Sequence, residues 1–246
     1  MNKIILIIGF LGFALQAQSY LYIWQGGVKT DSFVVTNNLK IDFRTAIIMG
    51  IPCPGIPSVT YEGKTYNTVQ IGTQCWLKEN LNVGTRIDVA QNASNNDTIE
   101  KYCYDNNETN CDTYGGLYQW NEAIQYDTSP GTRGICPSGW HIPTNAEFET
   151  LVSSVNNDGN ALKSIGQGTF GGQGTNTSGF SALLVGFRHF YNYFCNFGDI
   201  VYFWSTTENS SFGATSLGLL YNEDYIYVGS SSKEYGFSIR CVKDSN

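Results

Sequence analysis

Charged residues are scarce in this chain of 246 residues: they make up 14% of it, and its net charge at pH 7 is −7. No cluster of lysine and arginine could follow a phosphate backbone, which argues against nucleic-acid binding. Only two histidines occur, so candidates for general acid–base catalysis are few. Beyond the N-terminal segment, no stretch has about 18 consecutive apolar residues, so we expect no membrane span in the mature protein.

The N-terminal segment, residues 1–17, has the pattern of a secretory signal peptide. Lys3 supplies the positive charge, residues 4–15 form an apolar stretch too short to cross a bilayer, and residues 15–17 (Leu-Gln-Ala) form an acceptable cleavage site. No cysteine lies at that site, so a lipid anchor is not indicated. We expect a protein that is secreted or held on the outer cell surface, with a retained membrane anchor as the alternative.

Seven cysteines in an exported chain indicate disulfides, and the odd number leaves at least one cysteine over. Cys103 and Cys111 flank a short polar loop and are expected to pair. Asp105, Glu108 and Asp112 around this loop offer the oxygen ligands that Ca²⁺ prefers. A solvated loop tip explains these carboxylates better, so we expect no cofactor, with Ca²⁺ at this loop as the open alternative.

The chain is predicted to divide at a proline-rich stretch. Residues 18–57 contain short β-type segments and end in residues 51–57, which we interpret as a stiff linker because proline fixes φ and cannot continue a ladder. The main domain is predicted to cover residues 58–244.

Residues 134–155 carry the clearest helix signal. Thr144 and Glu147 have the spacing of a capping box at a helix N-terminus. The apolar residues that follow have the spacing of one helical face: Phe148, Leu151, Val152 and Val155. His141 lies in the strand before this helix, where a hydrogen-bonded structural histidine is expected rather than a catalytic base.

The remaining pattern is one of short elements. A helix is predicted at 117–124 and a helical turn at 160–165. The glycine-rich loop 166–179 lacks the Gly-Lys-Ser/Thr ending of a phosphate-binding loop. The predicted C-terminal β segments are 180–187, 202–205, 216–221, 225–228 and 236–242.

Six stretches, in this order, resemble the Fibrobacter succinogenes major paralogous domain. They are YEGKTYNTVQIGTQCWLKENL (61–81), YCYDNNETNCDTYGGLYQWNEA (102–123), GICPSGWHIPTNAEFETL (134–151), GFSALLVGFR (179–188), FWSTTE (203–208) and YGFSIRCVKD (235–244). The resemblance covers nearly all of the expected mature chain. It implies a fold and an extracellular location more than an activity.

At a coarser level, CPSGWHIPTNAEFETL with GFSIRCV is similar to the C-type-lectin-like fold, including its formylglycine-generating-enzyme branch. This resemblance implies an α+β domain with two helices packed on short antiparallel sheets, here with a small N-terminal β appendage. In the lectins, a cysteine before the first core strand pairs with one on the last strand, which implies a bridge between Cys136 and Cys241. The pairing of Cys53, Cys75 and Cys195 stays open.

The enzyme branch carries a reactive cysteine pair before its final strand, whereas residues 205–236 contain no cysteine. Cys195 and His189 have the residue types of a nucleophile and its base, but no third orienting residue is visible. The calcium and sugar ligands of classical lectins have no clear match either. We therefore expect no enzymatic activity, and an oxidoreductase of the formylglycine-generating type is the disfavoured alternative.

Aromatic residues crowd the stretch 189–201, where relatives are expected to carry small polar residues. In the lectin-like fold this region forms the ligand-binding face, and exposed aromatic rings supply contact area there. The predicted binding residues are His189, Phe190, Tyr191, Tyr193, Phe194, Phe197, Leu217, Tyr225 and Tyr227. The alternative is that these rings fill a core.

The residue types at 189–201 and 215–230 also resemble those in the target proteins of diversity-generating retroelements. We expect an adhesion module that binds a surface glycan or a protein. A structural component of the cell surface or matrix is the alternative.

Overall fold

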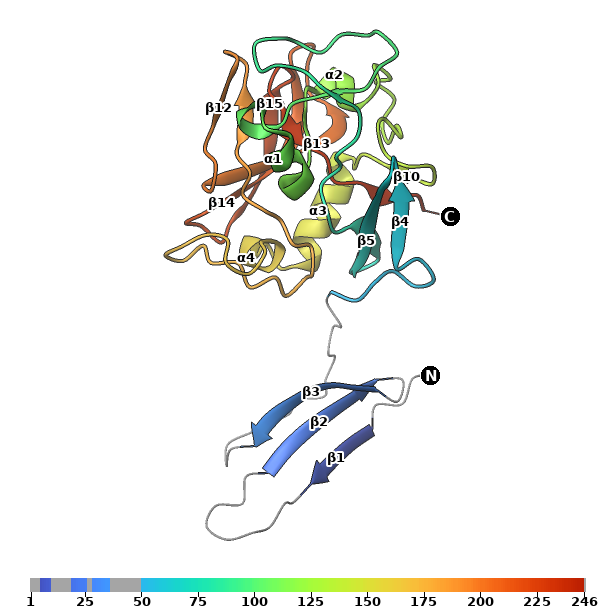
Figure 1. Cartoon of the computed structure of the whole chain (residues 1–246), viewed down its shortest axis with the longest axis vertical. Helices are drawn as coiled ribbons and strands as arrows, with labels where there is room; N and C mark the ends of the chain where they lie inside the picture. The colour runs from blue at the N-terminus through green and yellow to red at the C-terminus, as the bar shows by residue number, and fades with distance from the viewer. Residues whose placement is uncertain (1–4, 10–18, 26–27, 36–49, 246) are drawn as a thin grey trace. The chain divides into compact units, whose positions relative to one another are not determined.

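The computed structural model describes residues 5–9, 19–25, 28–35 and 50–245. The chain divides into two compact units, Met1–Ile47 and Ile48–Asn246. In the first unit, β1 (Ile5–Gly9), β2 (Ser19–Gln25) and β3 (Val28–Val35) form an antiparallel sheet in that order (Figure 1). The expected signal cleavage site lies outside the described residues, and so does the part of the expected β-type segments that falls within residues 36–49.

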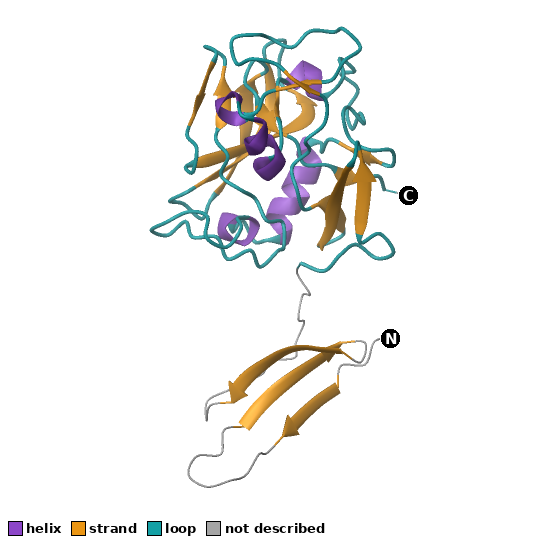
Figure 2. Ribbon diagram, viewed as in Figure 1, coloured by secondary structure: helices purple, strands orange, loops and turns teal. Residues whose placement is uncertain are grey.

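The second unit has few helices and many short strands (Figure 2). The helices are η1 (Tyr104–Asn106), α1 (Glu108–Tyr114), α2 (Trp120–Ala123), α3 (Asn145–Ser154) and α4 (Gly159–Leu162). The strands are β4 (Ser58–Tyr61), β5 (Lys64–Ile71), β6 (Gln74–Leu77), β7 (Thr85–Arg86), β8 (Glu100–Lys101), β9 (Leu117–Tyr118), β10 (Trp140–His141), β11 (Phe187–His189), β12 (Tyr193–Cys195), β13 (Ile200–Glu208), β14 (Gly213–Leu220), β15 (Ile226–Ser232), β16 (Phe237–Ser238) and β17 (Val242–Lys243).

Two five-stranded sheets organise this unit, in the orders β10-β17-β6-β5-β4 and β15-β14-β13-β16-β9. Within these two sheets, neighbouring strands are antiparallel except β13 and β16, which pair in parallel. Both faces of β13 are buried: Val201 and Phe203 belong to one apolar cluster, and Ile200 and Trp204 to the other. The architecture is therefore a mixed α/β one in which strands dominate.

The capping box and the buried apolar face predicted for this helix are confirmed in α3. Thr144 accepts a hydrogen bond from the Glu147 N–H while the Glu147 side chain accepts one from the Thr144 N–H, which completes the capping box. Phe148 and Leu151 are fully buried, and the Phe148 ring stacks on Trp76 at 6.3 Å between centroids. The helix is thereby fixed against the first five-stranded sheet.

Three disulfides close the second unit, and two of them are the pairs expected from the sequence and the resemblance, Cys103–Cys111 and Cys136–Cys241. The third joins Cys53 to Cys75. It ties residues 51–57 to β6, and the Ile51 carbonyl accepts a hydrogen bond from Gln70 of β5. The proline-rich stretch therefore belongs to the second unit.

Two predicted elements differ from the structure. Residues 117–118 form strand β9, so the helix predicted over 117–124 is shortened to α2, because β9 pairs with β16. Of the strand predicted over 180–187, residues 180–186 are irregular backbone with isolated bridges, and only Phe187 belongs to a strand, β11. Ser181 has a φ of 59°, and its N–H donates to the Asn176 side chain, so its backbone bonds to the preceding loop instead of a ladder.

Candidate functional site

The aromatic stretch predicted as a binding face folds into a short hairpin. β11 pairs with β12 in the register Phe187 to Cys195, Arg188 to Phe194 and His189 to Tyr193. Asn192 in the turn has a φ of 65°, a conformation that asparagine adopts more readily than most residues. Because side chains alternate across a strand, His189 and Tyr193 share one face of the hairpin and Arg188 points to the other.

The outward face of the hairpin carries closely packed rings. The His189 and Tyr193 rings are stacked, with 4.7 Å between centroids and an interplanar angle of 9°. Tyr191 lies 5.2 Å from His189 and is 71% exposed, while Tyr193 is 48% exposed. Phe190 and Tyr235 complete the group, with 5.1 Å between their centroids. We call these five residues the hairpin cluster.

Below the cluster, the rings continue into the core. Tyr235 stacks on Phe237 at 5.4 Å, and Phe237 lies 4.3 Å from the buried Trp204 ring. A continuous series of ring contacts therefore connects the hairpin cluster to the buried core.

Arg188, on the inward face, fixes the hairpin to the rest of the unit. Its guanidinium is fully buried and lies 4.7 Å from the centroid of the Tyr102 ring. The acceptors of its hydrogen bonds are the carbonyl oxygens of Val89, Gln91 and Glu234 and the amide oxygens of Asn92 and Asn192. One planar donor group thus holds the turn of the hairpin, the loop around residue 90 and the segment before β16 together.

The nine predicted binding residues occupy separate places. His189, Phe190, Tyr191 and Tyr193 lie in the hairpin cluster. Phe194 and Phe197 turn away from it and pack on Tyr104, at 5.1 and 4.9 Å between centroids. Tyr225, just before β15, and Tyr227, within β15, form a separate pair with 4.8 Å between ring centroids, and they are 49% and 41% exposed.

Leu217 requires a correction. It is fully buried, and its strand neighbours are Phe203 on β13 and Val228 on β15. The period-two alternation of β14 turns Leu217 toward the apolar cluster that contains Phe203 and α3. Leu217 is therefore a core residue, and the prediction that it contributes to a binding face is wrong.

Cys195 is a free thiol without an activating partner in the described part of the chain. Burial raises the pKa of its thiol, which keeps it protonated. The His189 ring on the same hairpin packs against other rings, and its Nδ1 accepts a hydrogen bond from the Tyr191 N–H. Nucleophilic cysteines usually have a lowered thiol pKa, and burial shifts that of Cys195 in the opposite direction.

Two of the three carboxylates considered for Ca²⁺, those of Glu108 and Asp112, contact other side chains. Glu108 forms an ion pair with Arg86, at 3.2 Å, and Asp112 accepts a hydrogen bond from Asn82. Among the described residues, the compact group of possible metal ligands is Cys103, Glu108 and Cys111. Its two sulfur atoms are joined in a disulfide, so they are not thiolate ligands.

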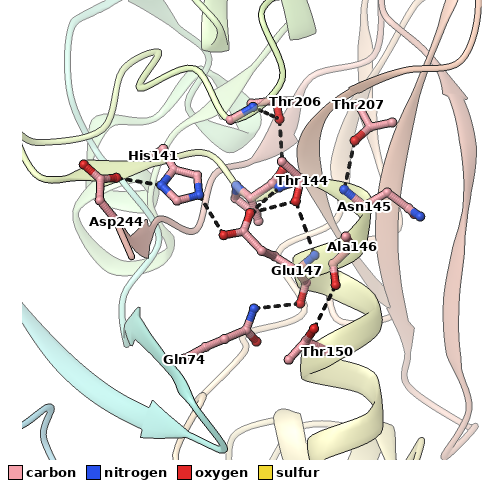
Figure 3. A network of polar contacts seen from close by, with 12 residues as sticks. Gln74, His141, Thr144, Asn145, Ala146, Glu147, Thr150, Thr206, Thr207 and Asp244 are labelled. Carbon is pink, nitrogen blue, oxygen red and sulfur yellow. Dashed lines mark hydrogen bonds and ion pairs between the residues drawn. The ribbon is translucent and has the colours of Figure 1, made fainter. Parts of the chain in front are cut away.

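His141 joins the start of α3 to the C-terminal segment (Figure 3). Its Nδ1 lies 2.7 Å from Asp244 Oδ1 and its Nε2 lies 2.8 Å from Glu147 Oε1. Burial disfavours the charged imidazole, but hydrogen bonds with these two carboxylates outweigh it and raise the pKa of His141. Burial also opposes the charge of Glu147, yet hydrogen bonds from His141 and Thr144 lower the pKa of its carboxyl. This is the structural histidine that the sequence indicates.

These shifts predict how stability depends on pH. The contribution of His141 is complete below its ordinary pKa of 6.5 and is lost as pH rises through the raised value of the folded state. The contribution of Glu147 is complete above its ordinary pKa of 4.5 and is lost as pH falls. We expect the melting temperature of wild type to exceed that of His141→Gln most between pH 4.5 and 6.5. Thermal melts of both proteins across pH check this, and a difference that grows above pH 6.5 would contradict it.

Two important residues of the site were not predicted from the sequence. Tyr235 supports His189 and Phe190, although it lies 46 and 45 residues further along the chain. Arg188 is the last residue of the motif GFSALLVGFR (179–188), and its role as a buried anchor was not predicted. The available signal was a single cation that separates an apolar run from an aromatic one, which is typical of a buried anchor.

Comparison with known proteins gives one family. Residues 69–243 match the Fibrobacter succinogenes major domain. No curated protein and no solved structure is significantly similar to the chain. The matched region contains the hairpin cluster, Arg188 and both expected disulfides.

Proposed function

This chain belongs to the Fibrobacter succinogenes major domain family, and from that membership and the hairpin cluster we propose that it is a non-catalytic ligand-binding module on the outside of a bacterial cell. One observation carries the proposal: Tyr191 and Tyr193 are exposed on a hairpin that Arg188 holds rigidly. Rings that are already fixed lose little entropy on binding, and their area and hydroxyl groups suit a glycan or a protein surface.

The finer fold proposed is a C-type-lectin-like one. It is supported by the mixed α/β architecture and by the bridge from Cys136, ahead of β10, to Cys241, ahead of β17. Export is supported by three disulfides in the second unit, since such bonds persist in oxidising compartments. Among the described residues, no helix has the length and apolar character needed to cross a membrane.

Diversification of the region is part of the proposal, and burial limits where it could act. Tyr191, Tyr193, Tyr225 and Tyr227 are exposed and can vary without loss of core packing, whereas a polar residue at Leu217 would be buried. A reverse transcriptase gene and a template repeat beside the encoding gene would support diversification. The absence of both would reject it.

The first experiment compares the full chain with Tyr191→Ala/Tyr193→Ala on a glycan array and on extracts of neighbouring cell surfaces. We expect binding of the variant to fall at least about tenfold, because truncated aromatic anchors usually cost more than 1 kcal/mol of binding free energy. The melting temperature should change little, because both side chains are largely exposed.

Phe212→Ala is the matched control, since Phe212 is 82% exposed in the turn between β13 and β14. It should bind like wild type. A folded wild-type protein that binds nothing would favour a structural role at the cell surface. Turnover of a substrate by the pure protein would instead revive the enzymatic alternative.

A further inference from the structure

Strand β15 forms an open edge of the sheet β15-β14-β13-β16-β9. Within the described ranges, β14 is the only strand paired with it. Its seven residues, Ile226–Ser232, include no charged residue and no proline. Natural edge strands usually carry such residues because they prevent pairing with other chains. The edge therefore lacks the usual protection against an added strand.

The register shows which backbone groups face this edge. The N–H of Lys233, just after β15, donates to the Phe212 carbonyl oxygen on the β14 side. In an antiparallel pair, successive residues turn these groups in alternate directions, so the odd-numbered residues of β15 face β14. The N–H and C=O groups of Ile226, Val228 and Ser230 are consequently free to pair outward.

A pocket with an apolar side lies next to the same edge, between β15 and α3, and Glu149, Ser153 and Asn157 form its polar side. Its volume is about 370 Å³, and Val152 of α3 lines it together with Tyr225, Ile226 and Val228. Ile226 is buried while Val228 is 37% exposed. A strand added along β15 would place every second side chain on the pocket side. The pocket can then take an apolar side chain of that strand.

The charged residue that lines the pocket is negative. It is Glu149, which is exposed and accepts a hydrogen bond from Asn145 at one carboxylate oxygen. The residues that line the pocket include no lysine or arginine. The site therefore favours a ligand with a positive charge beside its apolar side chain.

We propose that the β15 edge and the adjoining pocket bind an extended peptide segment of a partner protein, which adds to the sheet as a sixth strand. Its backbone pairs with Val228 and Ser230, an apolar side chain enters the pocket, and a lysine or arginine lies near Glu149. Strand addition beside a helix is an established way of binding peptides. The site is separate from the hairpin cluster, so it is a second binding site, specific for an extended peptide.

The probe for a test is a phage-displayed library of random linear dodecapeptides, selected on the full-length protein. We expect the selected sequences to share an apolar residue and a nearby lysine or arginine. A labelled synthetic copy of one sequence then reports affinity by fluorescence anisotropy. Failure to select any such sequence would overturn the proposal.

Ser230→Pro removes an N–H that faces the free edge and leaves the bonds to β14 in place, a position at which proline is tolerated. We expect its affinity for the peptide to fall at least about tenfold, since a backbone hydrogen bond is lost and the ring obstructs pairing. Ser230→Ala retains the N–H and should bind like wild type. Val228→Lys places a charge on the edge and should also abolish binding, whereas Val228→Thr should retain most of it.

Melting temperatures establish that each variant is folded. Unchanged affinity of a folded Ser230→Pro or Val228→Lys variant would overturn the proposal. Loss of peptide binding in Tyr191→Ala/Tyr193→Ala, with Ser230→Pro unaffected, would do the same by assigning the peptide to the hairpin cluster. A wild-type dimer that Ser230→Pro converts to a monomer would assign the edge to a second copy of the chain.

Discussion

Replacement of Cys136 and Cys241 by alanine is expected to lower the free energy of unfolding by about 4–5 kcal/mol. The bridge spans a sequence separation of 105 residues, and both cysteines are fully buried. A cross-link stabilises mainly by restricting the unfolded chain, and the restriction grows with the length of the loop that it closes. The double variant measured by urea denaturation at equilibrium checks the expected loss.

The Cys103–Cys111 bridge supplies the matched control, because its cysteines are also buried but only 8 residues apart. The same substitution there should lower the free energy of unfolding by about 2.5 kcal/mol. Each double variant removes two buried sulfur atoms, so the difference between their losses reports loop length. Equal losses would contradict the loop-length explanation and would point to local packing around the sulfur atoms.

The position of the long bridge explains why its loss matters for the whole second unit. Cys241 directly precedes β17, where Val242 pairs with both His141 of β10 and Trp76 of β6. The bridge holds the C-terminal strand at one point, and the His141 contact with Asp244, drawn in Figure 3, holds it at a neighbouring one. A strand of two residues has too few ladder bonds to hold itself in place.

The sequence predicted best those features whose signals are local. The capping box at Thr144 and Glu147, the buried face of α3 and the pairing of Cys103 with Cys111 each depend on residues less than about ten positions apart. The family resemblance supplied the Cys136–Cys241 bridge, which no spacing within this sequence could specify. Family membership likewise came from six motifs in order rather than from physical chemistry.

Leu217 shows why the face of a strand was harder to predict. An alternation of apolar and polar residues identifies a strand with one buried face, but both faces of β14 are covered, and Ala214, Leu217 and Leu219 are all buried. Gly218, on the face of β14 opposite to Leu217, is buried beneath the Tyr202 ring, so a small residue there does not mark exposure. A shift of one residue in the assumed register exchanges the two faces.

The role of Arg188 could not be predicted from the sequence, for a different reason. The Val89 and Gln91 carbonyl oxygens that it contacts lie 99 and 97 residues earlier in the chain. No periodicity connects residues so far apart, and the acceptors are backbone atoms, which exist at every position. Only the fold shows that these carbonyl oxygens converge on one guanidinium.

Arg188→Ala should therefore lower the free energy of unfolding by about 3 kcal/mol or more, because it leaves several carbonyl and amide oxygens without a donor in a buried place. Arg188→Lys should lose part of this energy, since a lysine ammonium keeps the charge but cannot match the planar arrangement of acceptors. Arg86→Ala, which removes a partly exposed arginine paired with Glu108, should change stability by less than about 1 kcal/mol. Urea denaturation of the three variants tests this order.

Arg188→Ala also distinguishes a residue that holds the hairpin in place from residues that contact a ligand. Arg188 is fully buried and cannot touch a ligand, yet its contact with Asn192 holds the turn that presents Tyr191 and Tyr193. Arg188→Ala should thus reduce both stability and binding, while Tyr191→Ala/Tyr193→Ala should reduce binding alone. The near-ultraviolet circular dichroism of the aromatic rings should weaken in Arg188→Ala at temperatures where the protein remains folded. An Arg188→Ala variant that unfolds at the same urea concentration as wild type would refute the anchoring role, because the guanidinium would then contribute nothing to the hairpin.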